Sequence, residues 1–224
     1  INFAPSATKE IFIPAIPHTV KKVGAKSVEL PHSLRVLVPG EIDARVTVKV
    51  LSADGTFIPA GLESKLVKAG SVATLDLSPN LPAGKFGIQI SSNEPLVASV
   101  FSSTLAEGKS DFIWSTAVPA LTKFTLATSG IAPQLIFIGS SIRAEAELFF
   151  NNGKRKQVKI SGSEFATLKV PDGVRSVTFT KVGKGIYGAG LVATKSGYGY
   201  FPLAAGSLLT KSSVPLSNIR VLTP

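Results

Sequence analysis

The residues best suited to bind an anion form one run of cations: Lys154, Arg155, Lys156 and Lys159. The run follows the Asn-Asn-Gly of residues 151–153, which predicts a hairpin turn because Asn and Gly tolerate a positive φ. A hairpin tip of this charge could contact a polyanion such as a wall polymer, lipid head groups or nucleic acid. We favour the alternative of a solvated tip whose lysines keep an edge strand from mispairing. Nucleic acid is further disfavoured because no aromatic residues are interleaved with the cations.

The three tyrosines, Tyr187, Tyr198 and Tyr200, all lie in the C-terminal part of the chain. Tyr198 and Tyr200 are two residues apart, which places their rings on one face of a predicted strand. There the rings could stack on a sugar, so a carbohydrate-binding module is the alternative function. The favoured interpretation is cross-strand aromatic packing that supports the sheet.

Few residues could do acid–base or metal chemistry. Glu145 and Glu147 alternate with Arg143, which a charge ladder on one strand face explains. No pair of carboxylates resembles the acid and base of a glycosidase. His18 and His32 have no evident third ligand, and the chain has no cysteine. We therefore expect a protein that is not an enzyme and that binds no cofactor and no metal.

Residues 183–188 match the Gly-x-Gly-x-x-Gly pattern of dinucleotide sites. Such a site needs the pattern between a strand and a helix, with an acidic residue about 20 positions further on. Here the pattern leads into a short glycine-rich apolar segment, and no acidic residue follows Asp172. A bulge or close backbone packing explains these glycines better.

An apolar segment near the start, residues 10–15, contains Ile11, Phe12 and Ile13. One hypothesis is that it adds as a strand to an exposed sheet edge of a neighbouring molecule. The favoured alternative is that it pairs within its own unit. Trp114, in residues 112–114, is expected in the core or at a domain interface.

The elements that must position these residues are laid out twice along the chain. A phrase of apolar residues and proline recurs at residues 13–17, 117–121 and 213–216. Residues 42–50 alternate between apolar and polar, which is typical of a half-buried strand. The successive predicted strands and their counterparts are residues 42–50 and 142–148, 71–75 and 164–168, 86–90 and 174–179, and 96–101 and 188–192.

Short predicted strands separated by Gly, Pro, Asn and Ser indicate an all-β fold. We predict two tandem antiparallel β-sandwich domains of immunoglobulin-like type that arose by internal duplication. The first would span residues 1–115, and the second, basic domain residues 116–224.

Composition restricts the class of protein and the side that meets a charged partner. Of all residues, 44% are hydrophobic and 17% are charged, so the chain is not disordered. The net charge of +10 is concentrated in residues 121–224, which hold 13 Lys and Arg but 4 Asp and Glu. An anionic partner should therefore meet the second domain.

No stretch approaches the apolar length of a membrane span. The chain begins at Ile1, and we favour removal of a secretion signal over trimming of the chain.

Three segments carry a resemblance to known proteins: residues 111–121, residues 81–84 with the Phe-Gly-Ile that follows, and residues 95–100. In these the sequence resembles a family of uncharacterised secreted or envelope-associated proteins of actinobacteria. The resemblance implies export and tandem β-sandwich repeats. It transfers no functional residues.

We therefore expect a secreted or envelope-associated protein with a structural or adhesive role. It would present β-sandwich surfaces to other protein chains or to anionic cell-envelope polymer, and strand addition would give a homo-oligomer. No specific nucleic acid and no membrane span are expected.

Overall fold

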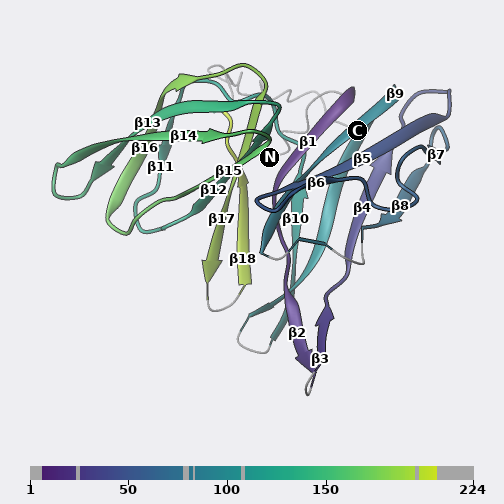
Figure 1. Cartoon of the computed structure of the whole chain (residues 1–224), viewed down its shortest axis with the longest axis horizontal. Coiled ribbons are helices and arrows are strands. Elements are labelled where there is room, and N and C mark those ends of the chain that lie inside the picture. The colour runs from purple at the N-terminus through teal and green to yellow at the C-terminus, as the bar shows by residue number, and fades with distance from the viewer. Residues whose placement is uncertain are drawn as a thin grey trace, which may run out of the picture.

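The computed structural model describes residues 7–23, 26–77, 81–82, 84–106, 109–194 and 197–205. These residues form strands, turns and loops and include no helix, so the all-β prediction is confirmed. It follows that no helix in the described ranges is long and apolar enough to cross a membrane. Two groups of sheets lie side by side, one from each half of the chain (Figure 1).

The N-terminal half contains two sheets that share one long strand, β9 (Lys85–Ala106). The first part of β9 pairs with β1 and β5, and we call this the N-inner sheet. The second part pairs with β4 and β10, and we call this the N-outer sheet. A separate hairpin, β2–β3, projects from this half (Figure 1). The other strands are β1 (Thr8–Pro17), β2 (Val20–Val23), β3 (Lys26–Glu29), β4 (His32–Leu37), β5 (Ala44–Ser52), β6 (Gly55–Phe57), β7 (Lys65–Val67), β8 (Val72–Asp76) and β10 (Lys109–Thr116).

The C-terminal half contains two four-stranded sheets. The order β11-β16-β13-β14 forms the C-outer sheet, and the order β15-β12-β17-β18 forms the C-inner sheet. The strands are β11 (Thr125–Ala127), β12 (Gln134–Gly139), β13 (Ile142–Phe150), β14 (Arg155–Gly162), β15 (Phe165–Lys169), β16 (Val174–Val182), β17 (Ile186–Thr194) and β18 (Gly197–Pro202).

Each half has its own apolar core between its two sheets. In the N-terminal half, Ile88 of the inner sheet and Val100 of the outer sheet belong to one buried cluster. In the C-terminal half, Phe137 of the inner sheet and Phe179 of the outer sheet belong to one buried cluster. Their rings meet edge to face, with centroids 6.0 Å apart. Alternate side chains fill these cores, as expected for half-buried strands packed face to face.

The N-inner and C-inner sheets pack against one another. Phe12 and Leu51 on the outside of the N-inner sheet form a buried cluster with Ile138 of β12. Gly87 leaves room for this contact, because a Cβ there would lie 2.7 Å from Cγ2 of Ile138. Lys49 also forms an ion pair with Glu164 of the other half. The layers therefore run N-outer, N-inner, C-inner, C-outer, except that β10 of the N-outer sheet also contacts β18, and its Ile113 joins a buried cluster with Ile136 and Leu191 of the C-inner sheet.

The two halves have the same strand order in both of their sheets. The N-outer sheet has the order β8-β4-β9-β10, and the C-inner sheet has the matching order β15-β12-β17-β18. The N-inner sheet has the order β6-β5-β9-β1, and the C-outer sheet has the matching order β14-β13-β16-β11. Strands at the same place in two matching sheets also follow the same order along the chain. The exception is β9, which serves both N-terminal sheets and takes the places of both β16 and β17.

Candidate functional site

The C-outer sheet ends the stack of layers and presents a charged outer side, which we call the charged face. Residues 142–148 of β13 alternate between buried apolar side chains and outward polar ones. The hairpin register places Arg143 opposite Ser161 and Glu145 opposite Lys159. On the other side of β13, Glu145 lies opposite Lys181 of β16. Three neighbouring strands thus contribute to one cluster.

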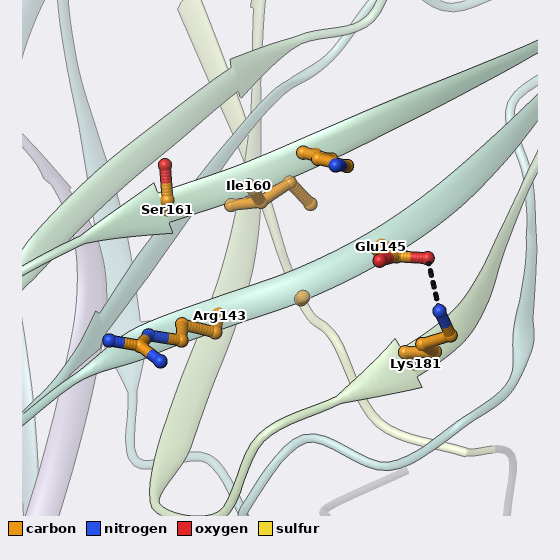
Figure 2. Close-up of a pocket in the computed structure, with 7 residues that line it drawn as sticks. Arg143, Glu145, Ile160, Ser161 and Lys181 are labelled. Carbon is orange, nitrogen blue, oxygen red and sulfur yellow. Dashed lines mark ion pairs between the residues drawn. The ribbon is translucent and has the colours of Figure 1, made fainter.

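This cluster lines a groove of about 360 Å³ (Figure 2). Its polar lining is Arg143, Glu145, Lys159, Ser161 and Lys181. Lys181 Nζ lies 3.0 Å from Oε2 of Glu145. Within the described part of the chain, Arg143 and Lys159 have no carboxylate partner. The groove therefore holds two uncompensated cations and a hydroxyl, which suits an anionic ligand.

The charged face continues along β13 beyond the groove. Arg155 Nη1 lies 3.3 Å from Oε1 of Glu147. The Arg155 and Arg175 guanidinium carbons lie 5.5 Å and 5.9 Å from the centroid of the Phe149 ring. Such contacts hold the guanidinium groups over the sheet, and Arg155 keeps N–H donors besides the Nη1 that faces Glu147, so both groups can still meet an anion.

The structure divides the predicted run of cations between different surfaces. Lys159 and Arg155 lie on the charged face, whereas Lys154 is in the turn, where its backbone N–H donates to Oδ1 of Asn152. Lys156 pairs with Leu148, whose side chain is buried, so Lys156 points to the core side of the sheet. Because β14 is the last strand of its sheet, an inward-pointing lysine there obstructs pairing with another chain.

Of the five polar residues of the groove, only Lys159 is a predicted site residue. The sequence pattern explains Arg143 and Glu145 as a charge ladder and does not single out Ser161 or Lys181. The hairpin turn at residues 151–153 gives the register that places Ser161 and Arg143 opposite one another, so this pair was within reach of the sequence. Lys181 reaches the groove through the pairing of β13 with β16, which no local pattern predicts.

Comparison with known proteins identifies the family. A model of a family of unknown function, DUF5719, matches residues 4–160. The chain belongs to this family. The matched range covers the N-terminal half and ends within β14. No curated protein matches the chain.

One solved structure is similar to this DUF5719 member, the crystal structure of Thermotoga maritima 1070. Its sequence identity is 15%, and the match covers 50% of this chain and 93% of that chain, with a TM-score of 0.41.

The tyrosines of this DUF5719 member lie against the contact between its halves. The Tyr187 ring stacks on Phe12, with centroids 3.7 Å apart and planes at 9°. The Tyr200 hydroxyl donates to the backbone oxygen of Thr116 at 2.7 Å, and burial raises the pKa of this phenol. Tyr198 packs against the same apolar cluster. These contacts match the packing interpretation, while sugar binding by the three rings stays a prediction.

The apolar segment Ile11, Phe12 and Ile13 lies within β1 and pairs with β9 of the same chain. Ile11 and Ile13 face the N-terminal core, and Phe12 faces the other half. Burial on both faces explains why this strand reads as a continuous apolar run. Strand addition to a neighbour stays a prediction, and it would require β1 to leave both contacts.

The other sequence features that could do chemistry lie elsewhere. His32 is buried, with Nδ1 2.8 Å from the Leu30 oxygen and Nε2 2.9 Å from the Pro17 oxygen. Burial lowers the pKa of this imidazole. In the described ranges no three His, Asp or Glu residues are grouped as metal ligands. Residues 183–185 form a turn between β16 and β17, and residues 186–188 are the start of β17, so the pattern does not lie in a strand-to-helix loop; Gly185 has a φ of 68°.

Proposed function

We propose that this DUF5719 member is a non-enzymatic extracellular protein with a structural or adhesive role. Its charged face would contact anionic material of the cell envelope. The observation that carries the proposal is the groove between β13, β14 and β16, where Arg143 and Lys159 lie beside the Ser161 hydroxyl and have no carboxylate partner among the residues that the structure describes. A secreted or envelope location belongs to the proposal and rests on the resemblance carried by residues 81–121.

The chemistry of the charged face favours a polymer over a single small anion. Exposed ion pairs contribute only about 0–1 kcal/mol each, so one pair of cations holds a small anion weakly. A polymer that carries repeated negative charges can meet the groove and the Arg155–Arg175 region together, and linked contacts raise the overall affinity. Such binding would weaken as salt screens the charges.

We further infer that the two halves are immunoglobulin-like β-sandwich domains, at residues 1–115 and 116–224, that arose by internal duplication. The support is their common strand order in both sheets. On this proposal, one copy acquired the cations on its outer sheet, which agrees with the 13 Lys and Arg of residues 121–224. The other copy kept a nearly balanced charge.

Retention on a polyanion column tests the proposed function. The variant Arg143→Ser/Lys159→Ser removes both unpaired cations of the groove and should elute at clearly lower salt than the unmodified chain. The matched control is Lys68→Ser/Lys169→Ser, which removes the same charge from exposed sites outside the groove. If both double variants elute together, net charge alone explains retention and the groove is not the site.

A further inference from the structure

The opposite end of the stack, the exposed side of the N-outer sheet, carries a cluster of aromatic rings that we call the aromatic face. Phe101 of β9 pairs with Trp114 of β10, and Phe112 lies two positions along the same strand. The Phe101 ring meets Phe112 at 5.6 Å and Trp114 at 5.4 Å between centroids. Phe112 is 56% exposed, which is unusual for a ring of this size in a sheet. Trp114, expected in the core or at an interface, lies half-buried on this outer side instead.

Hydrogen-bonding side chains surround these rings on the same side of the sheet. Arg35 of β4 places its guanidinium carbon 5.3 Å from the centroid of the Trp114 ring. The strand register then sets hydroxyl groups beside the rings: Ser103 lies opposite Phe112, Ser33 opposite Phe101, and Ser99 between Thr116 and Arg35. The face therefore combines an apolar platform with donors and acceptors at its margin.

We propose that the aromatic face binds a neutral carbohydrate chain. A pyranose ring has an apolar C–H side, which stacks on aromatic rings, and a rim of hydroxyl groups, which hydrogen-bond to side chains such as Arg35, Ser33 and Ser99. A docked protein would be expected to meet a broader apolar core than three rings bounded by hydroxyls. A polyanion fits less well than a neutral glycan, because the carboxylate of Asp76 lies on this side of the sheet and would repel it.

This site differs from the three tyrosines in both place and accessibility. Tyr198 packs with Ile113 on the inward side of β10, in the contact between the two halves, whereas Phe112 and Trp114 lie on the opposite, outward side of that strand. It also lies at the other end of the stack from the charged face, so a neutral glycan and an anionic polymer could be held at once. The proposal does not depend on the charged face binding anything.

Trp114 is the single tryptophan of the chain, so its fluorescence reports on the aromatic face directly. Titration with soluble neutral polysaccharides, namely a β-glucan, a mannan and an arabinogalactan, should change Trp114 emission with at least one of them. The same polysaccharide should protect Trp114 from iodide quenching. No change with any of these polymers would overturn the proposal.

Affinity electrophoresis in gels that contain the same polysaccharide locates the site. Phe112→Ala removes the most exposed ring and should weaken retardation at least tenfold, since each aromatic stacking contact contributes strongly to binding. The control Phe57→Ala, a partly exposed ring on β6, should change retardation less than twofold. Equal retardation of Phe112→Ala and the unmodified chain, or loss of retardation in Tyr198→Ala alone, would place the site elsewhere.

Solution size distinguishes a glycan from a second copy of the chain as occupant. Light scattering during size-exclusion chromatography should show no association that Phe112→Ala abolishes. A dimer that Phe112→Ala converts to a monomer would contradict the proposal, because the face would then be a protein interface.

Discussion

The two halves of the molecule share one strand order but differ in the strand that joins their sheets. In the N-terminal half, β9 runs for 22 residues and serves both sheets. In the C-terminal half, β16 and β17 serve the two sheets separately, and a turn with Gly185 at positive φ lies between them. The buried pattern is alike in both halves, but the exposed faces lie on sheets that do not correspond in strand order. The aromatic face is on the N-outer sheet, whereas the charged face is on the C-outer sheet, whose counterpart is the N-inner sheet. The comparison teaches that the inward residues keep the topology, while the packing of the halves decides which sheet of each is left exposed to carry function.

The largest effect is expected from Phe179→Ala, which removes a fully buried ring from the C-terminal core. Loss of a buried Phe side chain costs about 3–5 kcal/mol of unfolding free energy. Because buried clusters join the two inner sheets, the halves should unfold together. Urea unfolding followed by Trp114, which lies in the other half, should therefore shift with this variant. An unchanged Trp114 transition would show that the halves unfold independently.

Gly87→Ala tests the contact between the halves with a single methyl group. Its Cβ would lie 2.7 Å from Cγ2 of Ile138, and overpacking of this kind costs about 1–3 kcal/mol. The matched control is Gly40→Ala, where a Cβ would meet nothing within 4 Å. Thermal unfolding should separate the two variants by several degrees. Equal midpoints would mean that the inner sheets are not in close contact.

Acid should weaken the N-terminal half, which contains both histidines of the chain. Burial lowers the pKa of His32 below its ordinary value of 6.5, so the unfolded chain takes up this proton more readily than the folded one. The stabilisation that this group contributes is present above pH 6.5 and is lost as the pH falls through the folded pKa. Urea unfolding at pH 7 and pH 5 measures the difference.

The variant His32→Gln should show a flatter change in unfolding free energy between pH 7 and pH 5 than the unmodified chain. The substitution costs stability at both pH values because it removes the buried ring and its contacts with the Pro17 and Leu30 oxygens, to one of which the neutral imidazole donates. An unchanged slope would assign the acid sensitivity to other groups.

The smallest effect is expected from Glu145→Gln in the groove. The change frees Lys181 from its ion pair and adds to the uncompensated positive charge of the charged face. Unfolding free energy should change by less than about 1 kcal/mol, since exposed ion pairs contribute little. Polyanion retention should nevertheless increase. A decrease would mean that Glu145 holds the cations in their binding arrangement.

The sequence predicts those strands that bury one face: the alternating residues 42–50 overlap β5, which spans Ala44–Ser52, and residues 142–148 lie within β13. The sequence could not show that residues 86–90 and 96–101 belong to one continuous strand. A strand can pass from one sheet into the next without making a turn, so the pattern of turn residues does not reveal that it is continuous. The apolar run of β1 was open to two interpretations, because burial on both faces and exposure to a partner give the same pattern.

The candidate site was predictable in part. The cations of residues 154–159 indicate the sheet that carries the groove, but their alternation along β14 separates Lys156 from Lys159. Lys181 joins the groove through a pairing that has a register shift between Glu145 and Ala146. Such an irregularity depends on tertiary packing, so no spacing in the sequence gives it.

Amide hydrogen exchange in the presence of a polyanion tests the central claim most directly, because it locates the bound polymer. The account predicts slower exchange in β13, β14 and β16 on addition of polymer, with that protection removed by 1 M salt and absent from Arg143→Ser/Lys159→Ser. Protection in other strands with these three unchanged, or protection that survives in the double variant, would contradict it.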